Sequence, residues 1–348
     1  MHLHSRACAI VPPFLLQHLA ASTDAALADH ARRTLLHDDV LRARPARPAA
    51  HQALPQPMEA TLHRSVHDAA LGSALPGTLV RDEGAASSSD EAVNEAYDGL
   101  GDTWRLFEEV FGRNSIDDRG LALVASVHYE RNYDNAFWNG SQMVFGDGDG
   151  TIFLGFTRSL DVIGHELAHG VTESSAALTY QGQSGALNES VSDVFGSLVK
   201  QRALRQTAAE ADWLIGADLL APGVQGVALR SMKAPGTAYD DPRLGKDPQP
   251  ADMSGYVETT DDNGGVHINS GIPNRAFQLV ATTIGGKAWE AAGQIWYDVL
   301  TGAAIKPDCD FATFARLTAE AAVARFGAGS TEADAVDEAW RTVGVADG

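Results

Sequence analysis

The chain has 348 residues, of which 44% are hydrophobic and 21% are charged, a composition typical of globular proteins large enough for two domains. Its 46 acidic residues outnumber the 26 basic ones, and the resulting formal charge of −20 makes nucleic acid an unfavourable partner. No run of 18 apolar residues occurs, so we expect no membrane-spanning helix.

Residues 1–50 are predicted to form a short propeptide. The apolar stretch over residues 9–16 is interrupted by Pro12-Pro13, whereas a secretory signal needs an uninterrupted apolar core. Hydrophobic periodicity predicts one helix over residues 15–39, and the alternating Arg and Pro over residues 41–50 are typical of an exposed linker. We therefore expect maturation to cleave the chain within residues 41–58.

The remainder predicts two lobes and an α+β fold. Residues 51–160 alternate apolar runs such as 121–129 with Gly, Asp and Asn turns, which indicates a β-rich lobe with a helix near residues 89–111. Helical patterns dominate residues 161–348. The predicted helices cover residues 161–172, 187–206, 272–283, 287–300, 310–326 and 332–343. Asp147-Gly-Asp-Gly150 is predicted to be a tight turn, because the rest of an EF-hand pattern is missing.

One pentapeptide, His165-Glu-Leu-Ala-His169, points to zinc hydrolysis. On a helix, histidines at i and i+4 leave the same face and can bind one zinc ion. Glu166 then stands beside the metal and can take a proton from the attacking water and pass it to the leaving amine. Catalytic zinc needs a third protein ligand, for which Glu189 on the next predicted helix is the candidate. Asp193, four residues later on the same helix face, can accept the second N–H of a ligating imidazole.

Four segments of the chain, in this order, resemble the thermolysin family of neutral zinc metallopeptidases. They are Asn135-Ala-Phe-Trp-Asn-Gly-Ser-Gln-Met-Val-Phe-Gly-Asp-Gly-Asp-Gly150, His165-Glu-Leu-Ala-His-Gly-Val-Thr172, Gly185-Ala-Leu-Asn-Glu-Ser-Val-Ser-Asp193 and Asp262-Asn-Gly-Gly-Val-His-Ile-Asn-Ser-Gly-Ile272. The short N-terminal region is similar to that of the protealysin branch, although Phe14 stands where that branch has leucine. The resemblance implies a thermolysin-like two-lobe fold with the active-site helix between a β-rich N-terminal lobe and a helical C-terminal lobe.

The resemblance also implies roles for single residues. It makes His165, His169 and Glu189 the zinc ligands and Glu166 the catalytic carboxylate. Tyr180 and His267 match the pair that hydrogen-bonds the developing oxyanion, where donors aimed at new charge favour the transition state. Asp262 matches the carboxylate that orients this histidine. Without the resemblance, its local sequence Asp-Asp-Asn-Gly-Gly would predict only a turn residue. Arg230 matches the arginine that holds a substrate carbonyl.

Substrate preference is likewise implied by matching positions. An apolar pocket after the scissile bond would favour a bulky hydrophobic residue there, because burying such a side chain is worth about 1.5–3 kcal/mol. The residues that match this pocket are Phe153, Phe156, Val162, Ile215 and Leu229. Asn135 and Ala136 resemble the edge-strand residues that pair with an extended substrate, a binding mode that reads little sequence.

The chain departs from the family at its double calcium site. Asp161 and Asp212 match two ligand positions, but Lys200, Leu214 and Ala217 stand where acidic ligands are expected. Calcium requires many oxygen ligands, whereas a lysine at the centre of such a site supplies positive charge itself. We therefore expect Lys200 to pair with Asp161 or Asp212 and the full double calcium site to be absent.

Only two cysteines occur, Cys8 and Cys309, so no disulfide framework is expected. Cys309 is predicted to be inert. Cys8 is either an ordinary cysteine or a thiolate that occupies the open zinc position in the precursor.

The sequence therefore predicts a monomeric zinc endopeptidase that acts on peptides and is held latent by its own propeptide. The family acts mostly outside the cell, while the missing signal leaves cytoplasmic storage or another export route open. Two alternatives remain. An aminopeptidase would need acidic residues for the substrate amine, and a silent zinc or peptide-binding protein would not need Glu166, Tyr180 and His267.

Overall fold

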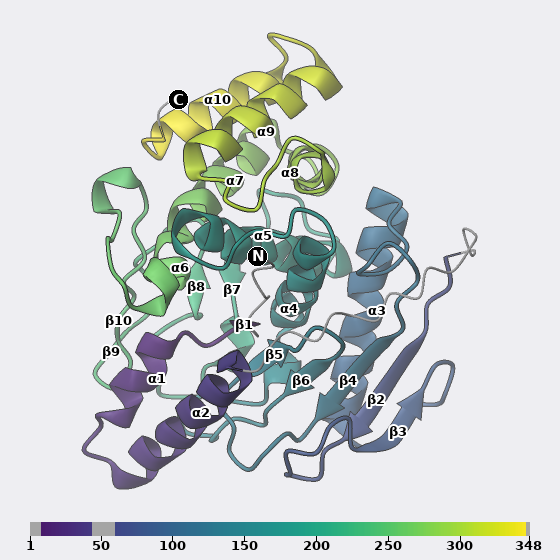
Figure 1. Ribbon diagram of the computed structural model, residues 1–348, viewed down its shortest axis with the longest axis vertical. Coiled ribbons are helices and arrows are strands. Elements are labelled where there is room, and N and C mark those ends of the chain that lie inside the picture. The colour runs from purple at the N-terminus through teal and green to yellow at the C-terminus, as the bar shows by residue number, and fades with distance from the viewer. Residues whose placement is uncertain (1–7, 44–59, 346–348) are drawn as a thin grey trace.

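The computed structural model describes residues 8–43 and 60–345. The structure has the predicted β-rich lobe, built on a mixed β-sheet, and the predicted helical lobe, and two helices lie between them (Figure 1). A separate hairpin of two helices from the N-terminal region lies against the sheet lobe. The predicted boundary at residue 50 and most of the Arg/Pro linker lie outside the described residues. None of the described helices is both long and apolar enough to cross a lipid bilayer.

The sheet has six strands in the order β1-β5-β6-β4-β2-β3. The inner pairs β2–β4 and β4–β6 are parallel, and the outer pairs are antiparallel. The strands are β1 (Cys8–Ala9), β2 (Arg64–Asp68), β3 (Thr78–Asp82), β4 (Leu123–Val127), β5 (Ala136–Trp138) and β6 (Met143–Phe145). Because β1 is an edge strand from the N-terminal region, the predicted propeptide extends the catalytic sheet.

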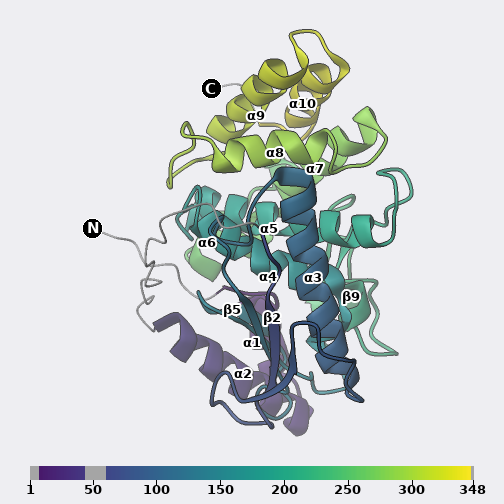
Figure 2. The same cartoon turned by 90° about the vertical axis from the view of Figure 1, so that its right-hand side faces the viewer.

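Helix α3 (Glu91–Phe111) runs along one face of this sheet (Figure 2). It begins where the Asp90 side chain accepts the Ala92 N–H at 3.0 Å, and it ends at Gly112, whose φ of 65° suits glycine. Its buried face includes Leu100, Trp104 and Phe107, so the sequence forms an amphipathic helix that closes the core.

The central helices α4 (Leu160–Glu173) and α5 (Gly182–Ala203) pack closely against each other. Glycines make this approach possible, because a β-carbon on Gly196 would lie 2.3 Å from the Asp161 carbonyl oxygen. The contact brings the inner faces of the two helices together between the lobes.

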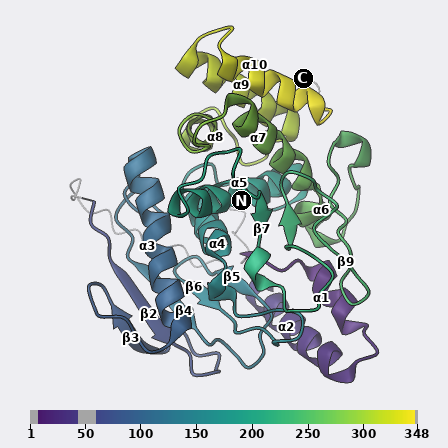
Figure 3. The same cartoon turned by 180° about the vertical axis from the view of Figure 1, so that it is seen from behind.

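The helical lobe surrounds α5 on the side away from the sheet (Figure 3). Its helices are α6 (Asp262–Asn269), α7 (Gly271–Ile284), α8 (Ala292–Thr301), α9 (Phe311–Phe326) and α10 (Thr331–Thr342). Four short strands pair in the connecting region, β7 (Leu214–Ile215) with β8 (Arg230–Ser231) and β9 (Asp240–Asp241) with β10 (Gly245–Lys246). The unpredicted helix α6 begins with positive φ values at residues 262–265.

The single helix predicted over residues 15–39 is wrong. The structure has two helices, α1 (Pro13–Ala20) and α2 (Ala25–Ala43). Asp24 explains the break, since its Oδ1 accepts the N–H groups of Ala26 at 3.0 Å and Leu27 at 3.3 Å and so starts a new helix. The predicted helix over residues 287–300 also begins later, at Ala292.

Candidate active site

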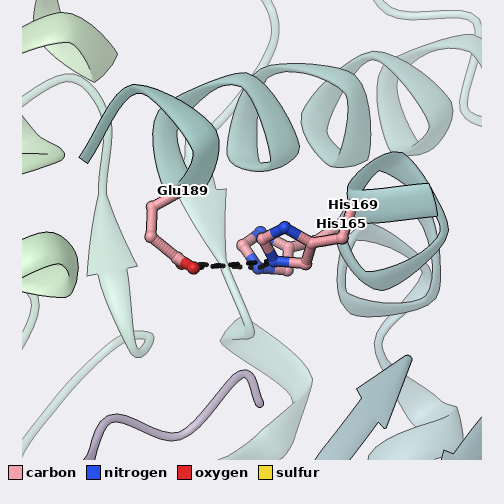
Figure 4. A group of neighbouring side chains, drawn as sticks. All are labelled: His165, His169 and Glu189. Atoms are coloured by element: carbon pink, nitrogen blue, oxygen red, sulfur yellow. Dashed lines mark hydrogen bonds and ion pairs between the residues drawn. The ribbon is translucent and has the colours of Figure 1, made fainter. Parts of the chain in front are cut away.

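Three buried side chains converge between α4 and α5. His165 and His169 come from α4 and Glu189 comes from α5 (Figure 4). The two histidine Nε2 atoms lie 3.1 Å apart, and each lies 3.6 Å from a Glu189 carboxylate oxygen. Among the residues that the structure describes, no other trio of His, Cys, Asp or Glu side chains is arranged to hold a metal ion.

Both histidines are oriented by hydrogen bonds at their other ring nitrogen. His165 Nδ1 lies 2.8 Å from Asp193 Oδ1, as predicted. His169 Nδ1 lies 2.8 Å from Asn188 Oδ1, a contact that the sequence analysis missed although Asn188 lies directly beside Glu189. When these Nδ1 atoms carry the hydrogen, both Nε2 lone pairs face Glu189, the tautomer needed to bind a metal.

The electrostatics of the trio suit a cation. Burial lowers the pKa of His169 to about 4, so the imidazole is neutral at pH 7. Burial alone would raise the pKa of Glu189, but His267, His169 and His165 lower it to about 2. A neutral imidazole and an ionised carboxylate are the protonation states in which these side chains coordinate metal.

Glu166 follows His165 on α4 and is fully buried. Its Oε2 accepts the backbone N–H of Trp138 at 3.0 Å, while its Oε1 has no hydrogen-bond partner among the described residues. Burial and then the nearby Glu189 raise the pKa of Glu166 well above its usual range. The carboxyl group therefore has one anchored oxygen and one available for proton exchange.

Tyr180, His267 and Asp262 meet beside Glu189. The Tyr180 hydroxyl donates to Glu189 and lies 3.2 Å from His267 Nε2. The Asp262 carboxylate accepts two hydrogen bonds from His267, one from the ring Nδ1 at 2.6 Å and one from the backbone N–H at 2.9 Å. Burial opposes charge on His267, but Asp262 and Glu189 raise its pKa. The structure thus brings the predicted donors together at one edge of the candidate metal centre.

Arg230 is buried and makes a bidentate ion pair with Asp193. Its Nε and Nη2 donate to the two Asp193 oxygens at 2.8 Å and 2.7 Å. Asn274 Nδ2 donates to the same carboxylate at 2.8 Å. Burial alone would raise the pKa of Asp193, yet Arg230 and His165 hold it well below its usual range. Asp193 therefore connects His165 to the predicted substrate-binding arginine.

The N-terminal segment follows the predicted substrate edge. Strand β1 pairs antiparallel with β5, and the Ile10 N–H donates to the Ala136 carbonyl at 3.1 Å. The Asn135 side chain contacts both backbone groups of Val11, with Oδ1 accepting its N–H at 2.9 Å and Nδ2 donating to its carbonyl at 3.3 Å. Arg230 Nη1 donates to the Ile10 carbonyl at 3.2 Å. An extended segment of this chain thus uses the predicted substrate contacts.

The predicted pocket residues are all buried in one hydrophobic core that also contains Ile10. Their exposed fractions are 0% for Phe153, Phe156, Val162 and Ile215 and 3% for Leu229. Which of these side chains contact a substrate stays a prediction.

Lys200 occupies the expected position of a calcium ligand. Its ammonium group contacts Asp161 at 2.8 Å, Asp212 at 3.0 Å and the Leu214 carbonyl at 2.8 Å. The predicted pairing is confirmed, and it includes both aspartates. Burial opposes the charge on Lys200, but Asp161 and Asp212 raise its pKa. The absence of bound calcium stays a prediction.

The two cysteines differ in what the structure describes. Cys309 is buried, and burial followed by the nearby Asp310 and Asp308 raises the pKa of its thiol to about 12, so the thiol is protonated at neutral pH. The Cys8 side chain lies outside the described residues.

Comparisons with known proteins agree with this geometry. The model of the thermolysin metallopeptidase catalytic domain matches residues 56–173, and that of the thermolysin metallopeptidase alpha-helical domain matches residues 176–345. The chain belongs to the thermolysin family of metallopeptidases. Homology to this family confirms the metalloendopeptidase activity and two-lobe fold expected from the sequence.

Three relatives are similar over nearly their whole length. An extracellular metalloprotease of Pectobacterium carotovorum subsp. carotovorum is 53% identical over 97% of this chain and 96% of its own. The protease PrtS of Photorhabdus sp. (strain Az29) is 48% identical over 97% of this chain and 91% of its own. The structure of the protealysin precursor of Serratia proteamaculans is 54% identical, covers 98% of this chain and 100% of its own, and has a TM-score of 0.90. The precursor supports a zymogen, and the extracellular metalloprotease supports secretion.

Proposed function

We propose that His165, His169 and Glu189 hold a catalytic zinc ion in an endopeptidase that is stored as a zymogen. The convergence of these three buried ligands beside Glu166 carries the proposal. The donor set fits zinc, which takes imidazole nitrogen and carboxylate oxygen and keeps an open position when only three protein ligands bind. The unpartnered Oε1 of Glu166 fits a water at that position.

Glu166 acts as the proton carrier of peptide hydrolysis. Zinc supplies Lewis acidity when bound, polarising the substrate carbonyl and making water a better nucleophile. The Glu166 carboxylate takes the proton of the attacking water and passes it to the amine as the amine leaves. The Trp138 N–H keeps the carboxyl group aimed during both transfers.

The other cleft residues position the substrate and stabilise developing charge. Tyr180 and His267 donate hydrogen bonds to the oxyanion, and Asp262 holds the imidazole in place. Arg230 and Asn135 bind the substrate backbone as they bind Ile10 and Val11 here. Broad specificity follows, because these contacts involve backbone atoms.

The N-terminal segment inhibits the enzyme by lying where a substrate would lie. Ile10 then represents the residue that follows the scissile bond, since Arg230 holds its carbonyl and its side chain is fully buried. This interpretation supports a preference for bulky hydrophobic residues at that position. It also accounts for latency until residues 1 to about 50 are removed, with the active form a secreted monomer.

The substitution Glu166→Gln tests the catalytic assignment. It keeps the shape of the side chain but removes the base, so we expect kcat/KM on a quenched peptide with Leu after the scissile bond to fall by roughly 10²–10⁴-fold. The variant precursor should stay uncut while wild type loses its N-terminal region. Mass spectrometry of the purified precursors shows whether each has lost its N-terminal region. Another protease then removes this region, and zinc content and peptide cleavage are measured on the same samples.

Glu173→Gln is the matched control, because Glu173 is exposed at the end of the same helix. It should mature and cleave like wild type. Full activity in zinc-loaded Glu166→Gln would contradict the role of Glu166, and a zinc-free but active wild type would contradict the metal assignment. Activity only on peptides with a free N-terminal amine would favour the aminopeptidase alternative.

A further inference from the structure

The Asp38 carboxylate, on α2 of the N-terminal region, is buried against the proposed substrate edge. Asp38 is 2% exposed. Its Oδ1 accepts the Tyr133 hydroxyl at 2.6 Å, and its Oδ2 accepts Asn135 Nδ2 at 2.9 Å. Hydrogen bonds to a carboxylate are stronger than those between neutral groups. Two donors of the catalytic lobe therefore bind a carboxylate of the segment that is predicted to leave on maturation.

Contacts within the catalytic lobe hold both donors in place. The Tyr133 carbonyl accepts the Gly148 N–H at 3.2 Å, and the Asn135 carbonyl accepts the Gly146 N–H at 3.0 Å. The Tyr133 ring packs edge-on against Phe137, with ring centres 6.1 Å apart. None of these contacts involves the N-terminal region. The donors should therefore keep their positions after maturation, which lowers the entropic cost of binding a new acceptor.

The position of this carboxylate relative to the substrate follows from Asn135. The same Nδ2 atom donates to the Val11 carbonyl at 3.3 Å, while Arg230 holds the carbonyl of Ile10. If Ile10 represents the first residue after the scissile bond, Val11 represents the second. Asp38 thus places its carboxylate beside the carbonyl of the second residue after the bond.

We propose that Tyr133 and Asn135 form a carboxylate-binding subsite in the mature enzyme, which Asp38 occupies in the precursor. The inference rests on the proposed function and adds a preference on the leaving-amine side of the substrate. The substrate carboxylate comes either from an Asp side chain in the third position after the bond or from the C-terminus of a peptide that ends at the second.

The neighbouring Asp134 does not oppose such a ligand. Its Oδ1 accepts the Asp149 N–H at 2.7 Å. Burial and then Asp149 raise the pKa of Asp134 well above its usual range, which favours its neutral form.

The test compares matched peptides on the matured enzyme. In the first pair, the residues after the scissile bond are Leu, Val and a third residue that is either Asp or Asn. In the second pair, the peptide ends at the Val, and its C-terminus is either a free carboxylate or an amide. We expect kcat/KM to be about tenfold higher for the carboxylate member of at least one pair. Tyr133→Phe should bring that ratio close to one. Tyr129→Phe is the control, because Tyr129 belongs to the same aromatic cluster but its hydroxyl lies 3.5 Å from His37 of α2.

The outcomes separate the subsite from the proteolytic function. A preference in the first pair identifies a side-chain carboxylate, and one in the second pair identifies the C-terminus. Equal cleavage within both pairs, or a preference that survives in Tyr133→Phe, would overturn the subsite and leave the endopeptidase intact. No chelator-sensitive cleavage of any peptide would overturn the proposed function as well.

Discussion

Lys200 is a buried cation that pairs with two aspartates, Asp161 and Asp212. Its side chain is 9% exposed, and Asp161, which it contacts, is 1% exposed at the side chain. Two further donors, the Ser159 hydroxyl and the Gly216 N–H, reach the other oxygen of Asp161 at 2.7 Å and 3.2 Å. The ammonium group therefore offsets the charge of a carboxylate in the first turn of α4.

Lys200→Met should destabilise the protein strongly. Removing one partner of a buried ion pair leaves an uncompensated charge and typically costs about 3–5 kcal/mol. Urea unfolding of variants in the uncut Glu166→Gln background measures the free energy of unfolding without autolysis. Calcium chloride should not shift the unfolding midpoint of the parent, since Lys200 already supplies positive charge.

Lys233→Met serves as the control, because Lys233 is exposed, and its urea unfolding midpoint should equal that of the parent. A Lys200→Met midpoint equal to that of the parent would show that Asp161 does not depend on the ammonium group. A calcium-induced rise in the parent would contradict the expected loss of the double calcium site.

At the scale of elements, His128 connects α3 to the turn after β6. Its Nε2 lies 2.8 Å from Asp90, the residue that caps α3, and its Nδ1 lies 2.8 Å from Asp147. The hydrogen bond with Asp147 is the main cause that raises the pKa of His128 to about 9, with Asp90 adding to it against the effect of burial. The two carboxylates therefore favour the charged imidazolium in the folded state.

His128→Gln should remove a pH-dependent part of the stability. Because the folded pKa of about 9 exceeds the unfolded value of about 6.5, the stabilisation is fully present below pH 6.5 and is lost as the pH rises through 9. The difference in unfolding free energy between parent and variant should thus be largest at pH 6 and vanish toward pH 10. Solvent screening keeps it modest, because both carboxylates are 38% exposed.

Urea unfolding at pH 6, 8 and 10 in the Glu166→Gln background measures this difference. His67→Gln on β2, where the ring contacts the Ser65 hydroxyl at 3.3 Å instead of a carboxylate, controls for loss of a histidine. A difference between parent and His128→Gln that stays constant with pH would argue against the charged bridge.

Helices with a strong periodicity of apolar residues could be predicted from the sequence. Helix boundaries that depend on the hydrogen bonds of a single side chain could not. The helices that carry the two histidines and Glu189 follow from apolar spacing, so the convergence of these three side chains could be predicted from the pentapeptide and the next helix. Asp24, which splits the N-terminal helix, was missed because its capping bonds compete with an apolar pattern that continues through it.

Side-chain contacts between residues far apart in the sequence were harder to predict than contacts between close neighbours. The role of Asp262 followed only from family resemblance, because its contact with His267 requires an unusual backbone with positive φ at residues 262–265. Asp38 and Tyr133 are 95 residues apart, and no periodic pattern links them. Asn188 could have been proposed from its position beside Glu189, since an amide oxygen there can accept a histidine N–H.

At the scale of the whole molecule, the charge of −20 creates a field that acts beyond the cleft. Residues 1–50 contain six Arg and four Asp, so the part that would remain after the proposed maturation is still more acidic. Such a field attracts cationic peptides and repels anionic ones over distances set by ionic strength. The screening length is about 30 Å at 10 mM salt and about 3 Å at 1 M.

We therefore expect salt to change kcat/KM according to peptide charge. A peptide with two Lys residues remote from the scissile bond should lose several-fold in kcat/KM between 10 mM and 1 M salt, because long-range attraction is screened. A neutral peptide of the same core sequence corrects for general salt effects. Identical salt dependence of the two peptides would mean that the net charge does not reach the cleft. The proposed carboxylate subsite acts at contact distance, so its Asp-to-Asn ratio should instead rise with salt as the long-range repulsion of the anionic peptide disappears.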